Sequence, residues 1–157
     1  MPIPVILDTD IGTDVDDVWA LAFLLRCPEL DIRLITTSTG DTHHRAALVA
    51  KMLRVAGRED VPIGIGLPLD HAPLGHPGWL GDYQLTDYPG PLYSDGVGAI
   101  CDTVMGSEEP LTIIAIGPLP NIAAALVREP GLTERSNFVG MHGSLRRGYL
   151  GAPKPMR

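Results

Sequence analysis

The sequence is poor in cysteine and in basic residues, and both shortages exclude classes of protein. Its 157 residues contain 2 cysteines, Cys27 and Cys101, without the CxxC spacing of a redox or zinc motif. We therefore expect both thiols to be free and buried in a reducing compartment. The 12 lysines and arginines stand against 19 aspartates and glutamates, which gives a net charge of −7. This balance argues against a nucleic-acid surface, which needs clustered positive charge.

Long apolar runs are also missing. No stretch approaches the length of a membrane span, and the N-terminus has neither the basic nor the apolar segment of a secretory signal. We therefore expect a cytoplasmic protein that contacts neither membranes nor nucleic acid. The composition that remains is ordinary for a globular protein, 45% hydrophobic and 20% charged, and the length predicts a single domain over residues 1–157.

The most informative segment is 5–17, which places five aspartates within ten residues. The apolar run before the acids is typical of a buried strand, and apolar residues recur at helical spacing over 18–25. The acids therefore lie on a turn between a strand and a helix, at the sheet edge where α/β proteins bind ligands. Like charges this dense call for a cation, and carboxylate oxygens suit Ca²⁺ or Mg²⁺. Helix capping is the alternative, but it explains only one or two of the acids.

Alternating strand and helix patterns continue along the chain. Strands are predicted at 31–37, 61–65, 111–116 and 138–141, and helices from 42 to a C-cap at Gly57, over 99–105 and over 122–127. Arg45, Lys51 and Arg54 fall among the polar positions of the second helix. This order predicts an α/β fold with an open, mainly parallel, Rossmann-like sheet flanked by helices. The polar turns that end four of the strands would then meet along one edge.

The pattern breaks down between residues 66 and 98, where seven glycines and five prolines accumulate. A stretch of this length without regular structure is either a functional loop or a poorly ordered insertion, and the sequence leaves both readings open. As a functional loop, it would be mobile without ligand and would close over the binding site.

Four segments of the chain carry a resemblance to a known family. They are residues 5–17, 35–40, 114–123 and 139–143, and in this order they resemble the inosine–uridine-preferring nucleoside hydrolases. Members of that family are about twice as long, so the likeness covers an N-terminal half, with the C-terminal part of the fold missing. The resemblance implies an enzyme that cleaves the N-glycosidic bond of purine and pyrimidine nucleosides with a Ca²⁺-bound water, giving ribose and the free base.

The resemblance also implies roles for single residues. Asp10 resembles the metal ligand that takes the proton of the attacking water. Asp17 and the backbone carbonyl of Ile116 resemble further ligands of the Ca²⁺ ion. Substrate-binding positions correspond to Asp16, Asp41 and Met141. Among these, Asp16 resembles the acid that hydrogen-bonds the ribose 2′-hydroxyl.

The chain departs from the family pattern at three points. The common motif reads Asp-x-Asp-x-Gly-x-Asp-Asp, whereas here Asp14-Val15 precedes the final acidic pair, as in one branch of the family. Asp41 occupies a position that is usually Asn, and it adds a negative charge near the sugar. The family's third metal-binding Asp and its remaining ribose-binding groups belong to the missing half.

Two other functions stay open at this point. A non-catalytic remnant of the same half-fold would bind metal or form oligomers, and the missing half supports that reading. An apolar strand followed by Asp8, Asp10 and Thr13 also resembles a haloacid-dehalogenase-like phosphatase, although the lysine and later acidic pair of that family have no counterpart. We further expect a homo-oligomer, because a sheet that ends after the last predicted strand leaves apolar surface open.

Overall fold

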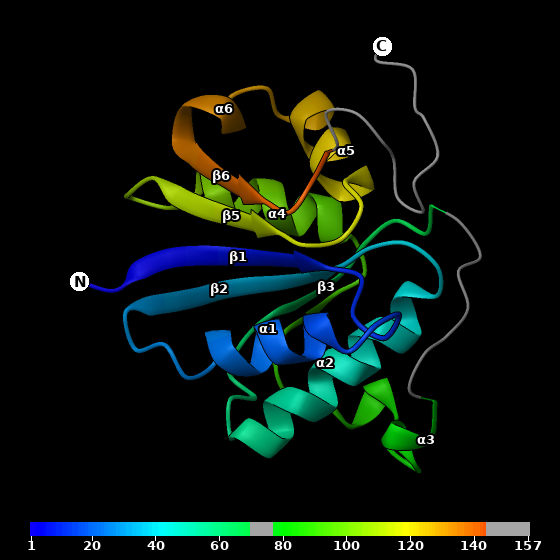
Figure 1. Cartoon of the computed structure of the whole chain (residues 1–157). Coiled ribbons are helices and arrows are strands. Elements are labelled where there is room, and N and C mark those ends of the chain that lie inside the picture. Colours follow the sequence, from blue (N-terminus) through cyan, green and yellow to red (C-terminus); the bar gives the residue numbers. More distant parts are fainter. Residues whose placement is uncertain (70–76, 144–157) are drawn as a thin grey trace.

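The computed structural model describes residues 1–69 and 77–143 (Figure 1). Six strands form one sheet in the order β4-β3-β2-β1-β5-β6, and every neighbouring pair is parallel. The strands are β1 (Ile3–Thr9), β2 (Leu30–Thr37), β3 (Ile63–Ile65), β4 (Leu92–Tyr93), β5 (Leu111–Ala115) and β6 (Ser136–Gly140). The predicted open, parallel, Rossmann-like α/β fold is therefore confirmed.

Helices cover both faces of the sheet, as Figure 1 shows. On one face lie α1 (Asp16–Leu24), α2 (Thr42–Ala56) and α3 (Pro77–Leu80), and on the other lie α4 (Gly96–Met105), α5 (Pro120–Arg128) and α6 (Leu132–Arg135). Within the described residues, no helix is both long and apolar enough to cross a membrane. Each layer of helices buries its own apolar core against the sheet.

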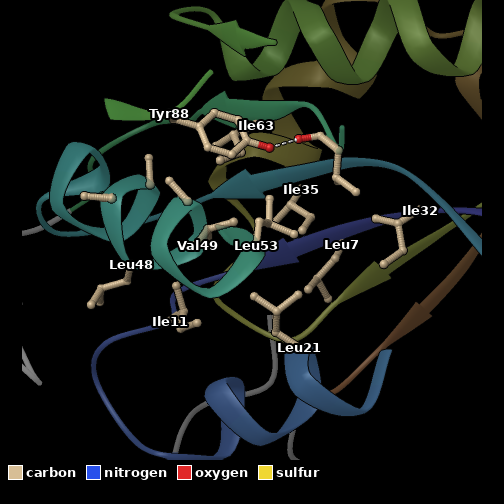
Figure 2. Close-up of a cluster of buried hydrophobic side chains, with 14 of the residues drawn as sticks. Leu7, Ile11, Leu21, Ile32, Ile35, Leu48, Val49, Leu53, Ile63 and Tyr88 are labelled. Atoms are coloured by element: carbon tan, nitrogen blue, oxygen red, sulfur yellow. Dashed lines mark hydrogen bonds between the residues drawn. The ribbon is translucent and has the colours of Figure 1, made fainter. Parts of the chain in front are cut away.

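The central strand β1 supplies side chains to both cores. Val5 and Leu7 pack into the core beneath α1 and α2, whereas Ile6 points into the core beneath α4 and α5. All three are at most 2% exposed. A parallel strand covered on both faces has no polar side to present, so its sequence is continuously apolar. Figure 2 shows the first of these cores, in which Leu7 of β1, Leu21 of α1 and Leu53 of α2 are labelled.

The stretch predicted to lack regular structure contains several short elements. Beyond residues 70–76, which lie outside the described residues, it holds α3, a 3₁₀ turn (Leu85–Asp87) and β4. In addition, α4 begins at Gly96, three residues earlier than expected. The Lys51 ammonium donates to the carbonyls of Trp79 and Leu80, at 2.5 and 2.8 Å, which fastens this segment to α2. Elements of two to four residues are too short to show a period, so the prediction failed here.

The strand order reverses beside β1. From β1 the chain proceeds outward through β2 and β3 to β4, and it then returns to place β5 and β6 on the other side of β1. In open α/β sheets, the crevice at the carboxyl ends of the strands flanking such a reversal is where ligands bind. The acidic turn lies at the carboxyl end of β1, next to that reversal.

Candidate metal and nucleoside site

The turn that leaves β1 is tied to the start of α1 by one threonine. The Thr9 hydroxyl donates to the Asp17 carboxylate and accepts from the backbone N–H of Ile11 at 3.0 Å. Gly12 follows with φ of 99°, a left-handed conformation that glycine adopts without strain. Asp17 is buried at 7% exposure although it carries a charge. The local sequence thus folds the turn so that an acid from α1 points inward beneath it.

Arg45 joins this turn to the neighbouring one. Its guanidinium donates to the carbonyls of Asp10 and Ile11 through one nitrogen, the latter at 2.7 Å, and to the carbonyl of Thr39 through Nε at 2.8 Å. The prediction that Arg45 occupies one of the polar positions of α2 is wrong, because its side chain is buried at 1% exposure. Its charge is accommodated in the core by backbone oxygens, which periodicity cannot reveal.

A second buried network lies beneath the site. Asp8 is fully buried, and its Oδ1 accepts from the Thr36 hydroxyl at 2.5 Å and from the Asn121 side-chain amide at 2.7 Å. The same amide of Asn121 donates to the carbonyl of Thr37 at 3.0 Å, and its oxygen accepts from the N–H of Leu67 at 2.8 Å. One side chain at the start of α5 thereby connects the ends of β1 and β2 and the segment after β3.

Burial raises the pKa values of three acids here. Desolvation brings the pKa of Asp8 to about 6, against hydrogen bonds from Thr36 and Asn121 that lower it. Desolvation also raises the pKa of Asp17 to about 6, and the charges of Asp10 and Asp16 add to the rise. The pKa of Asp10 is raised by burial too, and the positive charge of Arg45 partly opposes that rise. Such a cluster favours a bound cation, which would restore the charged forms.

The peptide after β5 approaches the acidic turn closely. A Cβ atom on Gly117 would lie 2.7 Å from both the backbone nitrogen and Oδ1 of Asp10, so only glycine fits there. The N–H of Ile116 donates to the carbonyl of Asp8 at 2.9 Å, which continues the pairing of β1 with β5. The Ile116–Gly117 peptide therefore lies beside the Asp10 carboxylate, at the reversal of strand order.

The remaining predicted site residues lie at different distances from this centre. Asp16 is the exposed first residue of α1, near enough for its charge to raise the pKa of Asp10. Met141 follows β6, donates its N–H to the carbonyl of Ala115 at 3.0 Å and is 66% exposed. Asp41 caps α2 by accepting from the N–H of His44 at 3.0 Å.

Asp41 faces an open cavity of about 480 Å³ at the carboxyl ends of β2 and β3. Asp10 and Asp17 are not among the residues that line this cavity. Its lining residues are Gly40, Asp41, Thr42, His43, Ile65, Gly66, Leu67, Pro68, Ser94, Asp95, Gly96 and Val97.

Within residues 1–69 and 77–143, no three acidic, histidine or cysteine side chains converge as a complete metal cage. The described residues offer a partial set of oxygen donors instead, namely two carboxylates and one neighbouring peptide. The sequence and the family resemblance singled out Asp10, Asp17 and Ile116, but not the supporting residues Thr9, Arg45 and Asn121. A polar residue directly after a buried strand was a signal available for Thr9, whereas no local pattern distinguished the other two.

Several known proteins similar to this chain are named nucleoside hydrolases. Residues 5–153 match the model of the inosine-uridine preferring nucleoside hydrolases. The non-specific ribonucleoside hydrolase RihC of Klebsiella pneumoniae is 36% identical, and the match covers 94% of this chain and 51% of that protein. A plant nucleoside hydrolase, PpNRh1, has a TM-score of 0.77 at 28% identity, with 96% of this chain and 51% of that one covered.

A purine-preferring ribonucleoside hydrolase from Gardnerella vaginalis has a TM-score of 0.74 at 26% identity, over 95% of this chain and 52% of that one. The chain thus spans about half the length of the relatives that it matches. Because the match of the family model extends from residue 5 to residue 153, the chain belongs to the inosine-uridine preferring nucleoside hydrolase family.

Proposed function

We propose that this chain supplies the cation-binding half of a site that hydrolyses the N-glycosidic bond of ribonucleosides to ribose and the free base. The observation that carries the proposal is the convergence of Asp10, Asp17 and the Ile116–Gly117 peptide at the reversal of strand order. The names of the similar proteins support a ribonucleoside as the substrate.

The residues present fit a Ca²⁺ ion. Two of the carboxylates have raised pKa values with a common cause, burial, and a divalent cation beside them would offset that cost. Asp10 and Asp17 would hold the ion together with the Ile116 carbonyl. Because Ca²⁺ takes about 6–8 oxygen ligands, further oxygens would come from substrate hydroxyls, from water and from protein groups outside the described residues.

The chemistry assigned to the site follows from its acids. A bound cation lowers the pKa of a nearby water. Asp10 would accept the proton of the attacking water at a carboxylate oxygen, and general-base assistance of this kind contributes about 10²–10⁴-fold to a rate. Asp16 would accept a hydrogen bond from the ribose 2′-hydroxyl. The negative charge of the turn would stabilise the oxocarbenium-like transition state.

Calorimetric titration with Ca²⁺, paired with ribose release from inosine and uridine, tests this function. We expect Asp10→Ala and Asp17→Ala to lose most of the heat of binding, because each removes a charged ligand. Asp31→Ala is the matched control, since Asp31 is an exposed acid on β2 that pairs with Arg33. Equal binding heats in the wild type and Asp10→Ala would refute the assignment.

A non-catalytic, metal-binding form of the chain is the second candidate. It is favoured by the partial donor set, because no complete cage forms within the described parts of the chain. Calcium binding without ribose release would identify it. The phosphatase reading, by contrast, loses its support, because Asp8 has no exposed surface from which to attack a phosphoester.

A further inference from the structure

Arg45 is a charged side chain in the core, and its hydrogen bonds converge on the turns that frame the site. It is 1% exposed, so its guanidinium is withdrawn from water. It sits in the first turns of α2, four residues after the N-cap Asp41, and its own N–H donates to the Asp41 carbonyl at 3.1 Å. The helix start and the guanidinium are therefore held as one rigid unit.

The carbonyls that Arg45 binds come from two separate turns. The carbonyls of Asp10 and Ile11 belong to the turn after β1, whereas the carbonyl of Thr39 belongs to the turn after β2. Thr39 has φ of 62°, which is unfavourable for a residue with a branched side chain. A strained conformation persists only where the surroundings hold it, and the bond from Arg45 to the Thr39 carbonyl does so.

We propose that Arg45 is a positioning residue that fixes the Asp10 turn so that the Asp10 and Asp17 carboxylates face one cation. This role rests on the proposed function, because it takes cation binding as the purpose of the Arg45 hydrogen bonds. Arg45 positions the turn through the backbone and not by contacting substrate. Its guanidinium donates hydrogen bonds to the carbonyls of Asp10 and Ile11, directly after β1. The turn is also held to α1 by the hydrogen bond from the Thr9 hydroxyl to the Asp17 carboxylate. The planar, forked guanidinium suits several fixed oxygens at once, which an ammonium group cannot match.

Two variants separate the contribution of the planar guanidinium donors from that of the positive charge, and a third acts as control. Arg45→Met removes both the fork and the charge, while Arg45→Lys keeps only the charge. Arg54→Met is the matched control on the same helix, because Arg54 is half exposed and pairs with Glu59 at 2.8 Å, away from the acidic turn. Far-UV circular dichroism establishes that each variant is folded.

Calcium calorimetry on the full chain is the first measurement. Loss of a group that orients metal ligands costs about 10–100-fold in metal affinity. We expect a fall of that size in Arg45→Met, a smaller fall in Arg45→Lys and no change in Arg54→Met. A folded Arg45→Met that binds Ca²⁺ as the wild type does would overturn the proposal.

Amide hydrogen exchange without metal is the second measurement, and it does not depend on the proposed function. We expect faster exchange at residues 11–13 in Arg45→Met, with the amides of β5 unchanged. An equal rise in β5 would mean global destabilisation and would overturn the positioning role, as would loss of the folded spectrum in both Arg45 variants. If the wild type binds no Ca²⁺ while exchange in Arg45→Met rises only in the turn, the proposed function is refuted. The positioning of the turn by Arg45 is then still supported.

Discussion

Asp8 illustrates how burial decides what a carboxylate can do. It stands two residues before Asp10 in an acidic run, yet it is the fully buried member, bonded to Thr36 and Asn121. Its other oxygen, Oδ2, finds no hydrogen-bond donor among the described residues. An ionised oxygen without a donor is costly in a low-dielectric interior. Burial therefore shifts Asp8, a structural acid, toward its neutral form, whereas Asp10 is only partly buried.

The raised pKa of Asp8 makes its contribution to the free energy of unfolding depend on pH. In the unfolded chain the group ionises near its ordinary value of 3.8, and in the folded chain it ionises near 6. The folded state therefore holds the proton more tightly, so this group lowers the free energy of unfolding as pH rises through that window. Two pKa units correspond to about 3 kcal/mol.

Urea unfolding of the metal-free protein between pH 4 and 7 tests that contribution. We expect the difference in unfolding free energy between the wild type and Asp8→Asn to change across the window in favour of the variant, because the amide has no proton to lose. Asp31→Asn, at an exposed position, is the control. A difference that stays constant with pH would show that Asp8 does not carry the effect.

Gly117 gives a second prediction for a single residue. Replacing it by alanine places a Cβ atom 2.7 Å from the nitrogen and Oδ1 of Asp10, which forces the strand end and the turn apart. We expect Gly117→Ala to weaken Ca²⁺ binding by about tenfold or more, since displacement of a ligand by about 1 Å is costly. Gly78→Ala, where a Cβ would meet nothing within 4 Å, should bind as the wild type does.

At the level of elements, α2 connects three parts of the molecule: the sheet, the acidic turn and the segment before β4. Its core face packs on β2 and β3, its N-terminal turns carry Arg45, and its outer face holds the segment before β4. There, Lys51 lies 5.0 Å from the centre of the Trp79 ring and Arg54 lies 4.8 Å from that of Tyr83. These cation–π contacts, with the hydrogen bonds of Lys51, hold residues 79–83 against α2.

Tyr88 anchors the same segment from within the core. Its hydroxyl donates to the carbonyl of Val61 at 2.5 Å, a bond drawn in Figure 2, and the side chain is 7% exposed. Tyr88→Phe leaves that carbonyl without its donor, so we expect the free energy of unfolding to fall by about 1–3 kcal/mol. Urea denaturation measures this change. Tyr93→Phe, at a 47% exposed position, should leave the midpoint within error, and an equal loss in both variants would contradict the role of the bond.

At the scale of the whole molecule, the edge of the sheet at β6 is the surface most prone to self-association. Phe138 and Val139 on this edge strand are 50% and 58% exposed, and Met141, directly after it, is 66% exposed. Edge strands with apolar side chains promote association. The chain spans about half the length of the relatives that it matches.

We expect the 157-residue chain to self-associate through this edge, and to hydrolyse nucleosides far more slowly than a full-length relative. Light scattering should show oligomers for the wild type and a shift toward monomer for Val139→Lys, which places a charge on the edge strand. Val127→Lys, at an 84% exposed position on α5, is the control. A monomeric wild type with turnover comparable to a full-length relative would refute both parts of this prediction.

The sequence by itself determined the alternation of strands and helices, the acidic turn after β1 and the bounds of α2 up to its left-handed cap at Gly57. These features are local: apolar period, capping residues and charge density are all read within one segment. The family likewise followed from four short segments, and the match over residues 5–153 confirms it.

Only the tertiary structure decided which polar residues lie inside and what they bind. Arg45 has the same helical spacing as a solvent-facing position, and it is buried because carbonyls from two other turns reach it. Asn121 is 113 residues from its partner Asp8, so no window of sequence contains both. Buried polar groups are stabilised by partners brought together by the fold, and that information is absent from local pattern.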